Sequence, residues 1–248
     1  MTTVEARGTG RKDYSQNVEY ISEPITKSAF NIDELSARIS PYFSVDRKGT
    51  LLWHDDFESL ATKWVFIPST IGTAVISGNR AWTGDNSLKI TTDAVIGDSL
   101  TFVKVLSAPF IHQNGLETCF FVSTGKPSIE FYLDGYNGGY YYEAGFRYDY
   151  NTATIYYENE SAGWMALPKK DPVEPTREHW VPVKIVADWD KLEYVRVLFG
   201  GTQYDLGGIK LYSVASSTQQ HIRPQIKTIA ETNDVATVFF GHVIVTNE

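Results

Sequence analysis

Residues 51–92 read LLWHDDFESLATKWVFIPSTIGTAVISGNRAWTGDNSLKITT, and this stretch decides the fold class. Its last six residues alternate, so that Leu88 and Ile90 share one side of the backbone and Lys89 and Thr91 share the other. A period of two is typical of a strand with one buried face. The preceding residues 82–86, WTGDN, supply the glycine and Asx residues that favour a turn. Short strands separated by such turns predict an all-β protein.

The same succession of strands and turns continues to the end of the chain. The composition agrees, because 15 Tyr, 13 Phe and 6 Trp stand against 2 Met, and aromatic residues favour strands. Turns are predicted at Asn114-Gly115, Asp134-Gly135, Asn137-Gly138-Gly139, Gly200-Gly201 and Gly207-Gly208. The predicted strands are residues 64–67, 73–77, 87–92, 99–106, 117–123, 128–133, 140–149, 154–158, 164–167, 180–189, 192–199, 209–214, 221–230 and 235–246. So many short strands, without a βαβ alternation, predict two packed antiparallel sheets.

Individual residues place some of these strands within the sheets. In the strand at 180–189, Val183 and Ile185 fall on the same side, which predicts that this side faces the core. Pro182 and Pro224 stand inside predicted strands. Proline cannot donate a hydrogen bond to a neighbouring strand, so we expect these two strands to be edges or to carry bulges.

One arrangement resembles a known family. The residues DDFE at 55–58, then Trp64, then GNRAWTGDNSLKIT at 78–91 resemble the opening of jelly-roll domains in the concanavalin-A-like lectin and glucanase group, which includes many carbohydrate-binding modules. The resemblance covers residues 51–248 and implies a two-sheet antiparallel jelly-roll β-sandwich. It also implies a structural calcium ion, held by Asp56 and Glu58 together with an aspartate of the last strand. Near that last position this chain carries Gly241-His242.

Residues 1–50 differ from the rest of the chain. They contain no Trp, and their seven basic residues balance seven acidic ones, so the net charge of −8 belongs to residues 51–248. Within them, residues 32–39 have the pattern of a short helix with Asn31 as its cap. We therefore predict an extended N-terminal arm, residues 1–50, followed by a sandwich, residues 51–248.

Charge and hydropathy restrict the partners. A net charge of −8 argues against general nucleic-acid binding, since affinity for phosphates comes mainly from Lys and Arg. No segment approaches the roughly 18 apolar residues of a membrane span, and the N-terminus lacks the apolar core of a signal peptide. We expect neither nucleic acid nor membrane as a partner.

The densest candidate site is residues 140–150, YYYEAGFRYDY. Alternation places Tyr141, Glu143 and Arg147 together on the more polar face. An aromatic ring beside carboxylate and guanidinium groups is suited to gripping a sugar, which stacks on the ring and hydrogen-bonds to the charged groups. We interpret these residues as a carbohydrate site; its full set is Tyr136, Tyr141, Glu143, Arg147, Tyr157 and Trp164. The alternative is that the tyrosines cover the sheet or fill a subunit contact.

The sequence carries no recognisable catalytic motif, and no catalytic residue is predicted. Glu130 and Asp134 share a strand face, but the Glu-x-Asp-x-x-Glu strand of the glucanase branch is absent. The five histidines show no metal-ligand spacing, although His54 and His242 would approach each other if the first and last strands pair. Cys119 alternates with a phenylalanine and is predicted to be a small buried hydrophobe.

Three functional hypotheses follow. The first is a non-catalytic structural or adhesive subunit of a virion, tethered by its arm to other subunits and forming a homo-oligomer, at a virion or extracellular surface and made without a signal peptide. The second is a stand-alone carbohydrate-binding module, for which secretion is the alternative location. The third is a glycoside hydrolase, which requires Glu130, Asp134 or Glu143 to form a facing pair of carboxyls.

Overall fold

A computed structural model describes residues 49–59, 63–69, 72–107, 112–168 and 179–248, and within them the secondary structure is strand and turn without helix. None of these residues forms a helix that is long and apolar enough to cross a membrane. The strands are β1 (Thr50–Asp55), β2 (Val65–Pro68), β3 (Thr73–Ser77), β4 (Ser87–Thr91), β5 (Ser99–Val103), β6 (Gln113–Thr124), β7 (Pro127–Tyr136), β8 (Tyr140–Asp149), β9 (Thr154–Glu158), β10 (Trp164–Ala166), β11 (Val181–Asp188), β12 (Glu193–Phe199), β13 (Thr202–Asp205), β14 (Tyr212–Ala215), β15 (His221–Ala230) and β16 (Thr237–Asn247).

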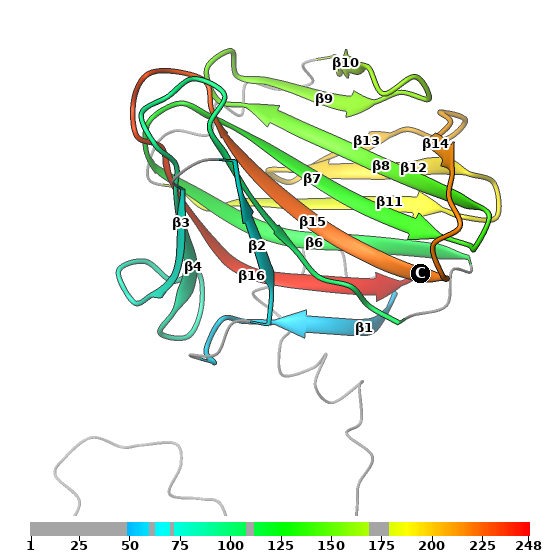
Figure 1. Cartoon of the computed structure of the whole chain (residues 1–248), viewed down its shortest axis with the longest axis horizontal. Helices are drawn as coiled ribbons and strands as arrows, with labels where there is room; N and C mark the ends of the chain where they lie inside the picture. Colours follow the sequence, from blue (N-terminus) through cyan, green and yellow to red (C-terminus); the bar gives the residue numbers. More distant parts are fainter. Residues whose placement is uncertain (1–48, 60–62, 70–71, 108–111, 169–178) are drawn as a thin grey trace, which may run out of the picture.

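The strands form two antiparallel sheets that lie face to face (Figure 1). Sheet A has the order β13-β12-β11-β6-β16-β4-β3, and β1 pairs with β16. Sheet B has the order β10-β9-β8-β7-β15-β5-β2, and β14 pairs with β8. Consecutive strands pair in part of each sheet, whereas β6 with β16, β16 with β4, β7 with β15 and β15 with β5 join distant parts of the chain, as in a jelly roll. The all-β prediction of a two-sheet antiparallel jelly-roll sandwich is confirmed.

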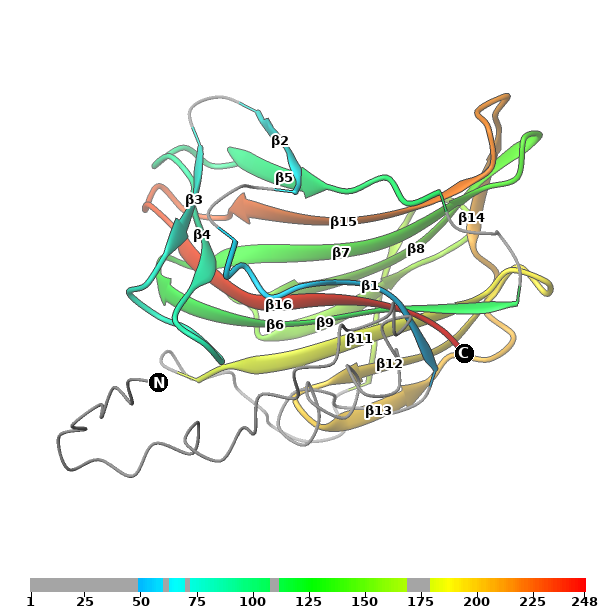
Figure 2. The same cartoon turned by 90° about the horizontal axis from the view of Figure 1, so that it is seen from below.

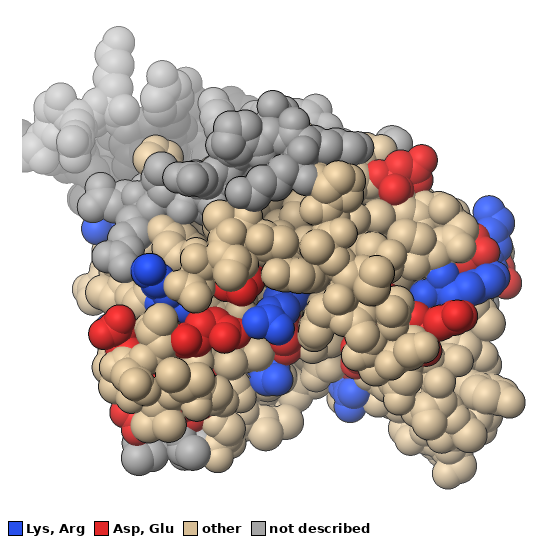
Figure 3. Space-filling view, turned by 90° about the horizontal axis from the view of Figure 1, so that it is seen from above, with Lys and Arg blue, Asp and Glu red and all other residues tan. Residues whose placement is uncertain are grey.

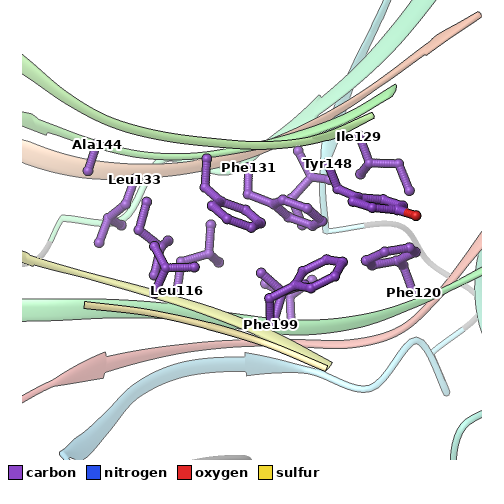
Figure 4. Close-up of a cluster of buried hydrophobic side chains, with 14 of the residues drawn as sticks. Leu116, Phe120, Ile129, Phe131, Leu133, Ala144, Tyr148 and Phe199 are labelled. Carbon is purple, nitrogen blue, oxygen red and sulfur yellow. The ribbon is translucent and has the colours of Figure 1, made fainter. Parts of the chain in front are cut away.

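The core lies between the sheets and is mainly aromatic. Phe120 and Phe199 of sheet A meet Phe131 and Tyr148 of sheet B (Figure 4). The ring of Phe120 lies 5.9 Å from that of Phe131, 6.1 Å from that of Tyr148 and 6.3 Å from that of Phe199. All four side chains are buried, so their rings form one continuous layer that joins the sheets.

The sequence patterns located most strands but mistook two strand interiors for turns. Predicted and observed bounds agree for 73–77, 140–149, 154–158 and 221–230, whereas β13 was not predicted. Asn114-Gly115 lies inside β6 and Asp134-Gly135 inside β7, so these two turn predictions are wrong. Both dipeptides pair with neighbouring strands on each side, and this tertiary pairing overrides their local preference for a turn.

Pro182 and Pro224 were expected to mark edges or bulges, and the edge prediction is wrong. β11 does carry a register shift against β12, but it lies between Val186 and Ala187 and not at Pro182. β11 lies between β6 and β12, and β15 lies between β5 and β7. Pro182 lies one residue before the pairing of β11 with β12, which begins with Val183 opposite Phe199. Pro224 lies one residue before the pairing of β15 with β5, which begins with Gln225 opposite Val103. The missing N–H therefore faces the end of a partner strand, where the ladder does not require it.

Cys119 and the inward face of β11 are as predicted. The cysteine is 1 % exposed, and Val183 and Ile185 are buried in the core. Burial raises the pKa of the Cys119 thiol well above its usual value. Residues 1–48, with the helix predicted near 32–39, lie outside the described residues, so the N-terminal arm stays a prediction.

The aromatic layer should control stability. We expect Phe120→Ala to lower the free energy of unfolding by about 3 to 5 kcal/mol, because it removes a buried ring that contacts three others. Chemical denaturation measures this loss. Ile96→Ala, at a side chain that is 59 % exposed, is the control and should change the free energy by less than about 0.5 kcal/mol. Equal losses in the two variants would contradict the assignment of the core.

Candidate functional site

The outer face of sheet B carries the candidate site. Figure 2 shows this sheet curving so that β2 and β5 at one end and β8 and β14 at the other turn to the same side, away from sheet A. Along β7 and β8, every second residue fills the core, and the residues between them point outward. The register places these outward residues in rows across the sheet. The rows are Glu130, Arg147 and Lys227; Tyr132, Gly145 and Gln225; Asp134, Glu143 and Arg223; and Tyr136, Tyr141 and His221.

The partner of β8 changes in the middle of this face. β9 pairs with residues 146–149 of β8, and β14 pairs with residues 140–143, so neither strand reaches Gly145. The Tyr194 hydroxyl, from sheet A, fills this gap: it accepts from the Gly145 N–H at 2.8 Å and lies 2.8 Å from the Glu158 carbonyl oxygen. This hydroxyl satisfies backbone groups that would otherwise be buried without partners.

Gly145 makes room for the side chains beside this gap. A Cβ atom at this position would lie 2.8 Å from Glu158 Oε2 and 3.2 Å from a ring carbon of Tyr132. The Trp164 ring, from β10, lies 6.1 Å from the Tyr132 ring. An aromatic pair and a buried carboxyl therefore meet over a residue without a side chain.

Three carboxyls lie at the centre of the face. Asp134 stands opposite Glu143 in the register of β7 and β8, and Glu158 lies beside Gly145, two residues along β8 from Glu143. The Tyr141 hydroxyl donates to Glu143 and lies 3.3 Å from Asp134 Oδ1. Glu158 is 5 % exposed, and its Oε2 atom has no hydrogen-bond partner among the described residues. This central group comes from three adjacent strands, β7, β8 and β9.

Close carboxyls cannot all be ionised at neutral pH. Burial, followed by the charge of Glu143 and a hydrogen bond with it, raises the pKa of Glu158 to about 9. Burial also raises the pKa of Asp134, but Arg223 opposes that rise, since its guanidinium contacts Asp134 Oδ2 at 2.7 Å. Both shifts favour the protonated form of these carboxyls.

Cations and further rings surround the carboxyls. The Arg223 guanidinium lies 5.2 Å from the centre of the Tyr136 ring and 5.8 Å from that of Tyr141, and Tyr136 stacks on His221 at 4.1 Å. Arg147 contacts Glu231 at 2.7 Å. Figure 3 shows acidic and basic side chains intermixed over the molecule, rather than a surface of one sign.

The structure brings together most of the predicted carbohydrate-site residues. Tyr136, Tyr141, Glu143 and Arg147 lie on the outer face, and Trp164 joins them from β10. Tyr157 does not share this face. It is paired with the core residue Phe146, and its ring lies 6.1 Å from that of the buried Tyr194.

Sequence reasoning missed four members of the site. Glu158 and Tyr156, rather than Tyr157, are the outward residues of β9, and the alternation within TIYYE was the available signal. Tyr132 was placed on the correct face beside Glu130 but was not selected as a ligand residue. Arg223 precedes the proline of β15, and only the pairing of β15 with β7 shows that it reaches Asp134.

The calcium ion at Asp56 and Glu58 stays a prediction. Both oxygens of the Glu58 carboxylate already accept hydrogen bonds from the turn at Asp85 and Asn86, at 2.9 to 3.1 Å. No group of three or more His, Cys, Asp or Glu residues within the described ranges is arranged to hold a metal ion. The first and last strands do pair, and the nearby His54 contributes, after burial, to lowering the pKa of His242 to about 3.

Comparison with known proteins identifies the fold. No protein-family profile matches the sequence, and no curated protein matches it. Among solved structures, the endo-β-1,4-glucuronan lyase of the fungus Trichoderma reesei is similar with a TM-score of 0.56 and 11% identity over 80% of this chain and 96% of its own. The cellulose-induced protein Cip1 has a TM-score of 0.50 and 16% identity over 79% and 97%. A carbohydrate esterase of the Shiga toxin-encoding bacteriophage phi24B has a TM-score of 0.50 and 15% identity over 81% and 100%.

These similarities define a class of fold. The chain is a two-sheet jelly-roll sandwich, which is the fold that the resemblance in residues 51–91 implied. At 11 to 16% identity they show the fold alone.

The raised pKa of Glu158 should make stability depend on pH. A group whose pKa is higher in the folded than in the unfolded protein stabilises the fold at low pH, and the contribution is lost as the pH rises through the folded-state value. For Glu158 the loss extends from its ordinary value near 4.5 to about 9. We expect Glu158→Gln, which is neutral throughout, to lose less stability than the parent protein between pH 5 and pH 9. Thermal unfolding at several pH values tests this; parallel curves would contradict it.

Proposed function

We propose that the outer face of sheet B binds a carbohydrate chain. The observation that carries the proposal is the set of aromatic rings arranged beside charged groups on one concave sheet face. Tyr132 and Trp164 supply flat surfaces on which sugar rings stack, and Arg147, Arg223 and the carboxyls supply hydrogen bonds to hydroxyls. Two of the similar structures are, by name, a glucuronan lyase and a carbohydrate esterase, which supports this class of ligand.

The geometry favours binding over glycoside hydrolysis. Hydrolysis uses two carboxyls about 5 to 10 Å apart on either side of the cleaved bond. Glu143 instead accepts a hydrogen bond from the Tyr141 hydroxyl and stands directly opposite Asp134 of β7, which contacts Arg223 at 2.7 Å. Glu130, the remaining candidate of the hydrolase hypothesis, accepts a hydrogen bond from the Tyr132 hydroxyl at 2.8 Å and contacts Lys227 at 3.4 Å.

Loss of one stacking ring tests the binding proposal. We expect Trp164→Ala to weaken binding of soluble oligosaccharides about tenfold or more, because it removes a ring from the face. A glycan array, run with and without calcium, identifies the ligand, and isothermal titration calorimetry measures its affinity. The control is Met165→Ala, at the next residue of β10, whose side chain is 46 % exposed. An array without any bound glycan would overturn the proposal.

A role as a subunit of a larger assembly is a second proposal, and the sheet edges support it. β2 and β3 are edge strands of the two sheets, and they lie at the same end of the molecule (Figures 1 and 2). Val65, Ile67 and Val75 on these strands are 62 %, 54 % and 51 % exposed. Apolar edge strands are surfaces that a second chain can cover. With the distinct composition of residues 1–50, they support a virion or similar structural subunit held to its neighbours by the N-terminal arm.

The mass in solution tests the assembly proposal. We expect the full chain to form oligomers in multi-angle light scattering at several concentrations, and a shortened chain beginning at Lys48 to form smaller ones, because the arm is the proposed tether. The carbohydrate affinity of the shortened chain is the control and should be unchanged. A monomeric full chain at every concentration would refute self-assembly and leave the binding role in first place.

A further inference from the structure

The acidic and basic side chains on the outer face of sheet B do not balance. Asp134 contacts Arg223 at 2.7 Å, Glu130 contacts Lys227 at 3.4 Å, and Glu231 contacts Arg147 at 2.7 Å. The two carboxyls that remain, Glu143 and Glu158, have no ion pair with a Lys, Arg or His among the described residues. Both stand at the centre of the face, where Glu158 Oε2 lies beside Gly145, two residues along β8 from Glu143.

Other buried carboxylates among the described residues have a cation or hydrogen-bond donors beside them, and Asp98 and Asp149 accept hydrogen bonds from backbone N–H groups. On sheet A, Glu117 and Glu248 are both within 4 Å of the Lys184 ammonium, at 3.7 and 2.7 Å. Asp55 contacts Lys63 at 3.3 Å and accepts from the Trp64 indole N–H at 2.9 Å. Burial of a carboxylate without such partners is costly. At Glu158, by contrast, no described residue forms an ion pair or donates a hydrogen bond to Oε2.

The surroundings of the pair are those of a site for a cation. Glu158 is 95 % buried, and its Oε2 atom points over Gly145 without accepting a hydrogen bond from any described residue. The Tyr132 ring lies beside it, with Trp164 beyond. Carboxylates combined with aromatic rings hold ammonium groups, through ion pairing and through attraction of the cation to the ring face.

The titratable groups around Glu158 determine its charge. Among the described residues, those that interact with its charge are Tyr132, Glu130 and Asp134 from β7, Glu143 from β8 and Tyr194 from sheet A. All except the tyrosines are acids, so the pair keeps a proton at neutral pH, and a bound ammonium group would supply the positive charge instead.

Resting on the proposed carbohydrate-binding function, we propose that Glu143 and Glu158 form a subsite for the protonated amino group of an amino sugar, so that the ligand is a polysaccharide with free glucosamine units rather than a neutral or acidic polymer. The sugar ring would stack on Tyr132 and Trp164 while its ammonium group donates hydrogen bonds to the two carboxyls. Glu158 Oε2, which accepts none within the described residues, is the atom assigned to the ammonium group.

Calorimetric titration with three hexasaccharides of different charge tests the proposal. The ligands are a glucosamine hexamer, its fully N-acetylated counterpart and cellohexaose, at a pH where the amine is protonated. We expect the glucosamine hexamer to bind at least about tenfold more tightly than the other two. Glu143→Gln and Glu158→Gln should each remove that preference. Glu160→Gln makes the same change of charge at an exposed residue two positions away and should keep it.

Each other outcome overturns the inference in a recognisable way. Equal binding of the three hexamers, lost in Trp164→Ala, would refute the ammonium subsite while leaving the proposed carbohydrate-binding function intact. An equal loss in Glu160→Gln would show long-range attraction by the negative charge of the protein rather than a subsite. Competition by Ca²⁺ at one ion per chain would show a metal site. Failure of all three hexamers and of the glycan array would refute the binding function itself.

Discussion

The alternation of β7 and β8 is the constraint on which the rest of the structure depends. Packing Phe131 and Phe146 into the core commits their neighbours, Glu130, Tyr132 and Gly145, to the outer face, because successive side chains of a strand point to opposite sides. Core and site therefore come from the same residues and cannot be changed independently. A shift of one residue in the pairing of these strands would exchange the aromatic layer with the carboxyls.

The fold was predictable from the sequence to the extent that it depends on local pattern. The outward position of Tyr141, Glu143 and Arg147 followed from period-two alternation, and four strands were bounded correctly. Local pattern failed where pairing with distant strands decides the conformation. Asp134-Gly135 has the composition of a turn, yet it continues β7 because β15 and β8 hold it on both sides.

The site was only partly predictable, for a related reason. Its members stand on β7, β8, β9, β10 and β15, and the register of those strands, not their sequence order, brings Arg223 to Asp134 and Glu158 to Glu143. Choosing Tyr157 instead of its neighbours was an error of one residue, and in a strand one residue reverses the face. The hydroxyl of Tyr194 bridges Gly145 and the Glu158 carbonyl from the opposite sheet, a contact that no sequence pattern along β9 indicates.

The burial of the central carboxyls destabilises the fold. An apolar or amide side chain at Glu158 would fill the same space without the penalty of a buried acid, so stability alone does not account for it. The same chain supplies a cation for Glu117, Glu248 and Asp55. A local departure from such consistency is typical of a functional site, where groups are arranged for a ligand rather than for each other. In this sandwich the carboxyls without a cation lie beside Tyr132 and Trp164, so the aromatic surface and these carboxyls belong to the same site.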